Sequence, residues 1–148
     1  MIDGIDRKIL QALERDGRMT NTELAGLVGL SASACLRRVQ ALEASGIIKG
    51  YRAVLDHGKL GAGFIAYVAV QLSRHTKEDQ KRFEDHMRNV PQVLECHNTT
   101  GTIEYMLRVQ AADLADYKRF HTEVLGTVPG VSGITSYIVM DSPIDRRG

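Results

Sequence analysis

The residues with the clearest capacity to bind another molecule lie in an expected helix that follows Ser31. At roughly 100° per residue, small side chains and two cations fall on the face opposite to the apolar residues of this segment. A slim, positive helix face fits the roughly 12 Å wide major groove of duplex DNA, where guanidinium groups bind guanine edges or phosphates. The alternative is an ordinary solvated helix surface. The residues on this face are Ser33, Ala34, Arg37, Arg38 and Ala41.

A second group of polar residues lies in a short segment, residues 99–105, that joins two expected strands. Successive backbone N–H groups in such a turn can form a nest for a carboxylate, and Glu104 or the threonine hydroxyls could bind an ammonium. A polar hairpin without a ligand is the alternative. The residues that could form the site are Thr100, Gly101, Thr102, Ile103, Glu104 and Tyr105.

Patterns typical of enzymes and metal sites are not found in the sequence. The five histidines have neither the His-x-x-x-His nor the Glu-x-x-His spacing that gathers metal ligands. Cys96 and His97 are adjacent in an expected strand, so their side chains should point to opposite faces and cannot act as nucleophile and base. Neither a nucleophile elbow nor a phosphate loop is present. We expect no enzymatic activity, no metal and no cofactor.

Three short helices are expected to position the cationic face. Residues 3–16 repeat apolar side chains at helical spacing, and Thr20 and Glu23 have the spacing of a capping box for a second helix that ends at Gly29. Ser31 is a good N-cap for the third helix, and Gly46 closes it. A capped short helix, a tight glycine turn and a capped third helix are typical of a helix-turn-helix.

The segment after this third helix changes its pattern. Residues 47–55 alternate like one or two short strands, with Lys49 and Arg52 as outward cations that would contact the phosphate backbone, as in the wing of a winged helix-turn-helix. Residues 56–63 contain three glycines and few large apolar side chains, which is typical of a linker. We therefore predict a winged helix-turn-helix domain at 1–55, a linker at 56–63 and a second domain at 64–148.

The second domain is expected to contain strand, helix, strand, strand, helix and strand. The expected elements are strands at 64–72, 93–100, 104–110 and 131–140, a helix at 77–90, and a helix capped by Asp113 with Leu114, Tyr117, His121 and Val124 on one face. The order βαββαβ is the ferredoxin-like split motif, so the whole chain belongs to the α+β class. Both helices would cover one face of the sheet, and a second copy of the chain would be an economical cover for the other.

Composition and charge are consistent with this division. The chain has 148 residues, of which 43% are hydrophobic and 25% charged, and a formal net charge of +1. Residues 1–60 contain nine basic against seven acidic residues, and the remainder ten against eleven, so the excess of positive charge lies with the expected DNA-binding part. No apolar run approaches the roughly 20 residues of a membrane span. With acidic residues at the N-terminus and two distant cysteines, we expect a cytoplasmic protein.

A series of short motifs runs along essentially the whole chain. They are Asp6-Arg7-Lys8-Ile9-Leu10, residues 29–43, residues 46–51, Glu95-Cys96-His97, Gly101 with Tyr105-Met106-Leu107, Pro129-Gly130-Val131 and Tyr137-Ile138-Val139-Met140. In order and spacing these motifs closely resemble those of the Lrp/AsnC (feast/famine) transcription regulators, and most closely those of the leucine-responsive type.

The resemblance implies a winged helix-turn-helix followed by an effector-binding and oligomerising domain called RAM. Such proteins form dimers that assemble into larger discs, often octamers, bind promoter DNA and respond to amino acids. Carried over to this chain, the DNA contacts would be Ser31, Ser33, Arg37 and Arg38, with Lys49 and Arg52 nearby. The effector would bind against residues 101–105, with Ser136 and Tyr137 of the last strand facing it.

One turn departs from the family pattern. The leucine-responsive group usually has Gly-Asp-aromatic-Asp, whereas this chain has Gly101-Thr102-Ile103-Glu104. The first acidic residue is missing and the second is longer, so the negative charge offered to an ammonium group is weaker or displaced.

The sequence thus predicts a DNA-binding transcription regulator whose oligomeric state or DNA affinity responds to an amino acid. The sequence leaves two alternatives open. One is a chromosome-architectural protein that binds DNA with little sequence preference and ignores small molecules. The other is an amino-acid-binding allosteric subunit whose N-terminal helices bind an enzyme instead of DNA.

Overall fold

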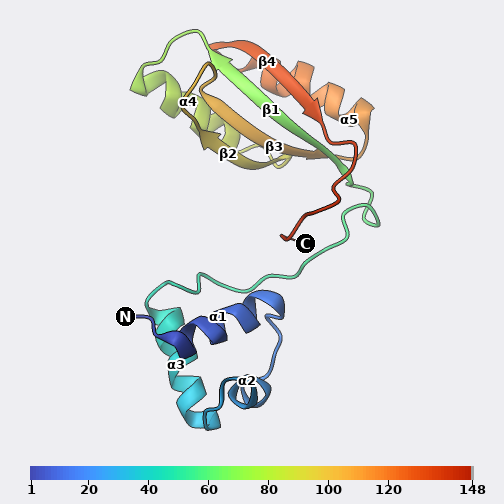
Figure 1. Cartoon of the computed structure of the whole chain (residues 1–148). Helices are drawn as coiled ribbons and strands as arrows, with labels where there is room; N and C mark the ends of the chain where they lie inside the picture. The colour runs from blue at the N-terminus through green and yellow to red at the C-terminus, as the bar shows by residue number, and fades with distance from the viewer. Residues whose placement is uncertain (148) are drawn as a thin grey trace. The chain divides into compact units, whose positions relative to one another are not determined.

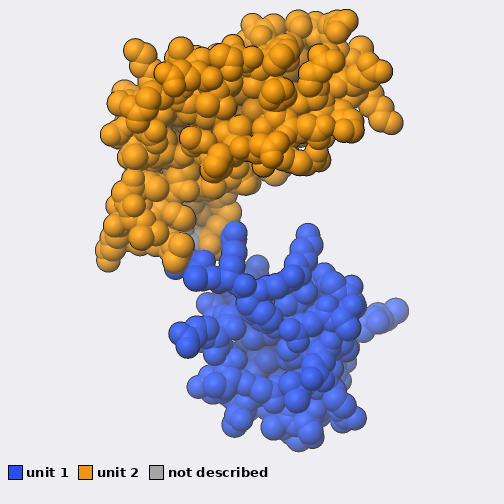
Figure 2. Space-filling model, turned by 180° about the vertical axis from the view of Figure 1, so that it is seen from behind, with its two compact units in different colours: residues 1–54 blue, residues 55–148 orange. Residues whose placement is uncertain are grey.

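The computed structural model describes residues 1–147, which fold as two compact units (Figure 2). The first unit is Met1–Val54, and the second begins at Leu55. Each unit has its own hydrophobic core. The fully or nearly fully buried residues of the first core are Ile9, Leu24, Ala25, Cys35 and Leu42.

Three helices make up the first unit: α1 (Gly4–Arg15), α2 (Asn21–Val28) and α3 (Ala32–Ala44) (Figure 1). The Thr20 hydroxyl accepts the Glu23 N–H and the Glu23 carboxylate accepts the Thr20 N–H, which confirms the capping box expected for α2. Ser31 caps α3 by accepting the Ala34 N–H. At the start of each of these helices, a side-chain oxygen accepts a backbone N–H that has no partner within the helix, which explains why the short helices begin where they do.

Gly29 makes the turn between α2 and α3. Its φ of +73° lies in the left-handed region, which glycine adopts without the steric penalty of a side chain. The chain then reverses through a single residue, Leu30, whose N–H donates to the Ala25 carbonyl. This geometry confirms the helix-turn-helix predicted from the sequence.

The strands expected at 47–55 are absent, although the structure describes every residue of this segment. A strand needs a hydrogen-bonded neighbour, and the backbone here bonds back to its own helix, from the Ile48 N–H to the Leu42 carbonyl. The alternation in sequence reflects packing instead, because Ile48 packs against the core of the unit while Ile47 is exposed. The prediction of a stranded wing was therefore wrong for this segment.

Residues 56–63, expected to form a linker, contain a compact turn. The Asp56 carboxylate accepts the Lys59 N–H, and the His57 carbonyl accepts the N–H groups of Leu60 and Ala62. The Gln110 side chain donates to the Ala62 carbonyl at 2.7 Å and fixes this turn to a strand of the same unit.

The second unit is a four-stranded antiparallel sheet with two helices on one side (Figure 1). Its elements are β1 (Phe64–Leu72), α4 (Lys77–Arg88), β2 (Val93–Asn98), β3 (Tyr105–Ala111), α5 (Leu114–Arg119) and β4 (Val131–Ile138). The strand order β2-β3-β1-β4 confirms the ferredoxin-like βαββαβ fold. The core lies between sheet and helices, where alternate residues of β1 and β3 meet Phe83 and Met87 of α4.

The second helix of this unit differs from the expected single amphipathic helix. After α5 the chain continues as a π-helical turn, Phe120–Val124, and then a short 3-10 turn, Leu125–Thr127. Each change of helix type rotates the following side chains away from the 100° period. Tyr117 is buried as expected, but Leu114 is 61% exposed, while Phe120 and Leu125 fill the core. The expected apolar face was therefore wrong for Leu114.

The face of the sheet away from the helices carries polar and aromatic side chains. Glu95 of β2 bonds to its neighbour His97, at 3.1 Å from the imidazole Nε2, whereas the intervening Cys96 packs on the core side, as strand alternation requires. The segment after β4 returns to this face, where the Arg147 guanidinium donates to Glu95 at 2.7 Å and to the Tyr67 hydroxyl at 3.4 Å. Charged contacts hold the pKa of Glu95 below its usual range, with the His97 hydrogen bond as the largest cause.

Candidate DNA-binding and ligand-binding sites

The outer face of α3 presents small polar residues at its N-terminal end. Ser31, Ser33 and Arg37 are all exposed, and Ala34 is half-buried. The Ser31 hydroxyl caps the helix and lies 3.4 Å from the Ser33 hydroxyl. Small side chains at a helix start let the backbone approach a surface closely, and Arg37 projects from the next turn of the same helix.

Arg38 does not project freely from this face as expected. Its guanidinium donates to the Asp3 carboxylate at 2.6 Å and to the Asp6 carboxylate at 3.1 Å, which ties α3 to the start of α1. The Arg38 hydrogen bond is the largest cause that lowers the pKa of Asp3, and the same two carboxylates raise the pKa of Arg38. The sequence could not reveal this contact, because the partners lie 35 and 32 residues away.

Lys49 and Arg52 follow α3 in the segment without strands. Both are exposed. They do not lie along a hairpin, so the arrangement expected of a wing is replaced by two cations on an extended stretch of chain. Long, flexible cations of this kind suit phosphate contacts, which fix position and not base sequence.

The segment 99–105 forms a closed turn before β3. The Thr99 N–H donates to the Glu104 carbonyl at 2.9 Å, and the Thr99 hydroxyl donates to the Ile103 carbonyl at 3.3 Å. Gly101 has a φ of +116°, which a residue with a side chain rarely adopts. The residues at the tip, Thr100, Gly101 and Thr102, are exposed, whereas Ile103 is half-buried.

Glu104 is turned into the protein. Its side chain is only 9% exposed, and the carboxylate accepts the backbone N–H of Leu72 at 2.6 Å and lies 2.5 Å from Nδ1 of His75. The expectation that this carboxylate waits for an ammonium ligand does not match the structure, because donors of the chain itself already occupy it. Sequence reasoning missed His75, since nothing in its local pattern marks it as the partner of a residue 29 positions later.

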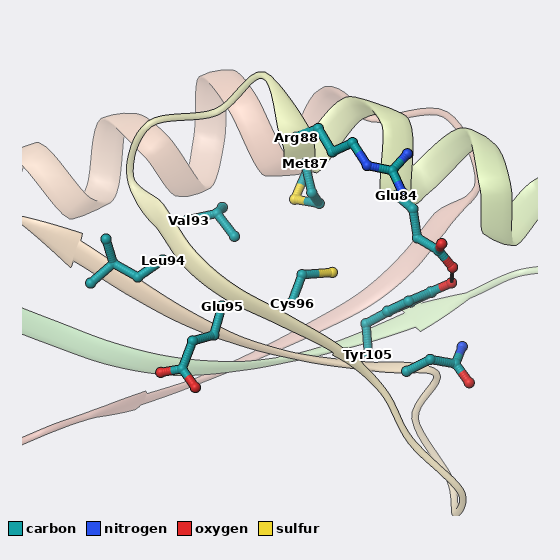
Figure 3. A pocket seen from close by; sticks show the side chains of 9 residues that line it. Glu84, Met87, Arg88, Val93, Leu94, Glu95, Cys96 and Tyr105 are labelled. Atoms are coloured by element: carbon teal, nitrogen blue, oxygen red, sulfur yellow. Dashed lines mark hydrogen bonds between the residues drawn. The ribbon is translucent and has the colours of Figure 1, made fainter. Parts of the chain in front are cut away.

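Tyr105 points to the helix side of the sheet. Its hydroxyl donates to the Glu84 carboxylate of α4 (Figure 3), and also approaches the Gln80 carbonyl at 3.4 Å. Burial is the main cause that raises the pKa of Tyr105 to about 12, and the hydrogen bond to Glu84 adds to it. Tyr105 is therefore a neutral donor at physiological pH.

Ser136 and Tyr137 of β4 lie on opposite faces of the sheet. The Ser136 hydroxyl is bonded to the Tyr117 hydroxyl beneath the helices, and Tyr137 is 57% exposed on the open face. Because β1 lies between β3 and β4, the structure does not bring this pair to the turn at 99–105 within one protomer. A site containing both would need a second copy of the chain.

Residues 1–147 contain neither a cluster of metal ligands nor a helix that could span a membrane. No group of three His, Cys, Asp or Glu side chains in that range could hold a metal ion. None of the helices described there combines the length and apolar character needed to cross a membrane.

Comparison with protein families decides the assignment. Residues 2–49 match the model for winged helix-turn-helix DNA-binding, and residues 65–148 match the model for the Lrp/AsnC ligand binding domain, which alone spans more than half of the chain. The chain belongs to the Lrp/AsnC family. The family resemblance inferred from the sequence motifs is thereby confirmed, and so is the combination of a helix-turn-helix with an α+β domain.

Named relatives are similar over nearly their full length. The Bkd operon transcriptional regulator of Pseudomonas aeruginosa is 44% identical over 145 residues, covering 98% of this chain and 95% of that protein. The leucine-responsive regulatory protein of Escherichia coli is 36% identical over 140 residues, covering 95% and 85%. Among solved structures, a Neisseria meningitidis transcriptional regulator in complex with L-Met is 34% identical, with a TM-score of 0.94 and coverage of 98% and 94%.

These findings establish the type of activity. This Lrp/AsnC protein is a DNA-binding transcription regulator with a separate ligand-binding domain, and it is not an enzyme.

Proposed function

We propose that this Lrp/AsnC regulator binds promoter DNA through α3 as a homo-oligomer, and that a free amino acid bound in the second unit changes its assembly or its DNA affinity. The observation that supports the DNA contact most directly is the exposed, small and polar start of α3, set behind the Gly29 turn and followed by the cation Arg37. This geometry suits entry of a helix into the major groove.

The proposed contacts divide by chemistry. Ser31, Ser33 and Ala34 allow close approach of the helix start, and Arg37 contacts a guanine edge or a phosphate. Lys49 and Arg52 contact the backbone. Arg38 is a positioning residue in this proposal, because Asp3 and Asp6 hold its guanidinium against α1.

The proposed oligomer follows from charge and from the open sheet face. Arg37, Lys49 and Arg52 are the few exposed cations that each protomer offers to DNA phosphates in this proposal, so one protomer releases few counterions and linked copies would supply the missing affinity. Tyr67 and Tyr137 are exposed on the open face, where they are direct neighbours on β1 and the edge strand β4. A dimer through this face, and an octamer built from dimers as the family resemblance implies, would cover them.

The proposed effector is a free amino acid, and the place of action is the bacterial cytoplasm. Support comes from the match to a ligand-binding domain over residues 65–148 and from the L-Met complex of the Neisseria relative. The exposed tip of the 99–105 turn is one candidate contact, with Ser136 or Tyr137 of a partner copy as another.

Selection of DNA sequences by the protein, with and without an amino-acid mixture, tests this function. The enriched site is then compared with random DNA by fluorescence anisotropy at several salt concentrations. We expect the specific site to bind at least about 1,000-fold more tightly at physiological salt. Equal affinities at every salt concentration would overturn the proposal and favour an architectural role. Absence of any duplex binding would favour an amino-acid-binding subunit that acts on another protein.

A further inference from the structure

The start of α3 is joined to α2 by the side chain of one residue. Nδ2 of Asn21 donates to the carbonyl of Ala32 at 2.8 Å. Asn21 is the first residue of α2 and Ala32 is the first residue of α3, so the bond connects the N-terminal ends of the two helices. Within residues 1–147, no second side-chain hydrogen bond joins these helices.

The other polar contacts of α3 with the first unit lie further along the helix. Arg38 bonds to the start of α1, and the Leu42 carbonyl accepts the Ile48 N–H. The buried side chain of Cys35 holds α3 on the core, but apolar packing is non-directional, whereas a hydrogen bond fixes direction. The direction of the first turn of α3 therefore depends on Asn21.

The start of α2 is itself well fixed. Thr20 and Glu23 exchange two hydrogen bonds in the capping box directly around Asn21. Leu24 and Ala25, in the same turn of α2, are buried in the core of the unit. Asn21 thus extends from a backbone that is held on both sides, and its half-buried side chain transfers this fixed position to Ala32.

The amide of Asn21 gains little net stability from this contact. Its Oδ1 is buried and has no hydrogen-bond donor among residues 1–147. Rotating the amide would place Oδ1 against the Ala32 carbonyl, so that two acceptors would face each other. The cost of a buried acceptor without a donor offsets the gain from the bond that Nδ2 makes. What the contact does supply is a fixed relation between α2 and the start of α3.

We propose that Asn21 is a positioning residue for the reading of DNA sequence. Through Ala32 it sets the direction of the start of α3, so that Ser33 and Arg37 meet base edges in register. The inference rests on the proposed entry of α3 into the major groove. Groups that recognise a partner must be held within about 0.5 Å of their productive positions.

The consequence is a loss of specificity and not of general affinity. Phosphate contacts such as those proposed for Lys49 and Arg52 carry no sequence information and depend less on the direction of α3. Without Asn21, the protein should still bind duplex DNA but should distinguish its selected site from random DNA less well.

Fluorescence anisotropy of the full-length protein, with the selected site and with a random duplex, tests this role. Asn21→Ala should lower the ratio of the two affinities at least about tenfold, with affinity for the random duplex within about twofold of wild type. Its melting temperature should stay within about 4 °C of wild type, because the lost bond is offset by removal of the unpaired Oδ1. Thr22→Ala, at the exposed neighbouring position, is the control and should change neither quantity.

A second variant covers the case in which Asn21→Ala folds poorly. Asn21→Asp keeps the shape of the side chain and removes the donor, and a carboxylate favours the first turn of α2. Its negative charge weakens binding to any DNA, so Thr22→Asp, which adds the same charge one residue later, is the matched control. Only Asn21→Asp should lower the ratio of affinities for the selected and the random duplex.

A double-mutant cycle with Arg37 separates positioning from direct contact with DNA. If Asn21 acts through α3, a helix without it no longer presents Arg37 correctly. The loss of affinity in the double variant Asn21→Ala, Arg37→Ala should then be smaller than the product of the two single losses. Single losses that multiply would show that Asn21 contributes independently of α3 and would overturn the positioning role.

The outcomes separate this inference from the regulator proposal. If the wild type prefers the selected site and both Asn21 variants keep the ratio of their Thr22 controls, the role of Asn21 is overturned and the regulator proposal stands. A melting temperature lowered by more than about 8 °C in both Asn21 variants would show a general structural role and would also overturn the inference. A wild type that does not distinguish the two duplexes would overturn both proposals.

Discussion

The two regions proposed to contact other molecules differ in how their polar side chains are engaged. On α3, Ser33 and Arg37 are exposed and free to meet a partner. In the segment 99–105, Glu104 is buried and occupied by Leu72 and His75, and Tyr105 is bonded to Glu84. The first region is a surface whose side chains can contact a partner without first breaking contacts inside the protein. In the second region the charged group, Glu104, stabilises the fold by bonding to other parts of the chain.

Residue type alone does not identify a binding group. A carboxylate that accepts a buried backbone N–H stabilises its own protein and has little capacity left for a ligand. Arg38 gives the same lesson within α3, since it adjoins Arg37 in sequence but is bound to Asp3 and Asp6. Side chains must be judged by their partners before they are assigned to a site.

The largest expected effect comes from removing the buried carboxylate. Glu104→Ala would leave the Leu72 N–H without its acceptor, and we expect the free energy of unfolding to fall by about 2–3 kcal/mol. Urea unfolding followed by circular dichroism measures it. Thr102→Ala, at the exposed tip of the same turn, is the control and should change stability by less than about 0.5 kcal/mol. Similar losses for both variants would show that Glu104 is not the structural group of this turn.

The next effect separates the two neighbouring arginines of α3. Arg37→Ala should weaken binding to the selected DNA site by about tenfold or more, because a direct contact is lost. Arg38→Ala should weaken DNA binding less and lower the melting temperature more, because it breaks the link to α1. Anisotropy titrations and thermal unfolding of both variants give the answer. A larger loss of DNA affinity in Arg38→Ala would contradict its assignment as a positioning residue.

A smaller effect on stability is expected at two glycines, Gly101 and Gly26, where an added Cβ would meet no other atom within 4 Å. Gly101 has a φ of +116°, whereas Gly26 lies inside α2 with no positive φ. Gly101→Ala should destabilise the protein by about 1–2 kcal/mol through backbone strain, and Gly26→Ala should stabilise it by about 0.5–1 kcal/mol. Thermal unfolding of both variants distinguishes conformational strain from steric filling of the turn. A neutral Gly101→Ala would show that the turn relaxes.

The smallest expected effect is a dependence of thermal stability on pH. Because contact with Arg38 lowers the pKa of Asp3 below its ordinary value of 3.8, this carboxylate stabilises the fold fully above that pH, and the contribution disappears as the pH falls through the lower, folded-state value. Wild type and Asp3→Asn should therefore differ most in melting temperature near neutral pH and converge in strong acid. A difference that stays constant down to pH 2 would contradict this coupling.

Much of the fold could be predicted from local sequence signals. The strand at 64–72 was predicted with the bounds that β1 has, and the caps Thr20 and Ser31 begin α2 and α3 as expected. These features depend on residues three or four positions apart, or on strict alternation, so a short stretch of sequence contains all the information needed. The failures at 47–55 and after α5 share a cause, since alternation cannot supply a partner strand and a 100° period does not describe a π-helical turn.

Residue identity and local periodicity are enough to identify the family, the order of the elements and the face of α3 that carries Ser33 and Arg37. Which polar groups are already paired depends on long-range packing. Arg38 meets Asp3 across the first unit, His75 meets Glu104 across the second, and Glu84 reaches Tyr105 from α4. These contacts join residues 21 to 35 positions apart, and no local pattern encodes a meeting that depends on how packed helices and strands bring distant side chains together.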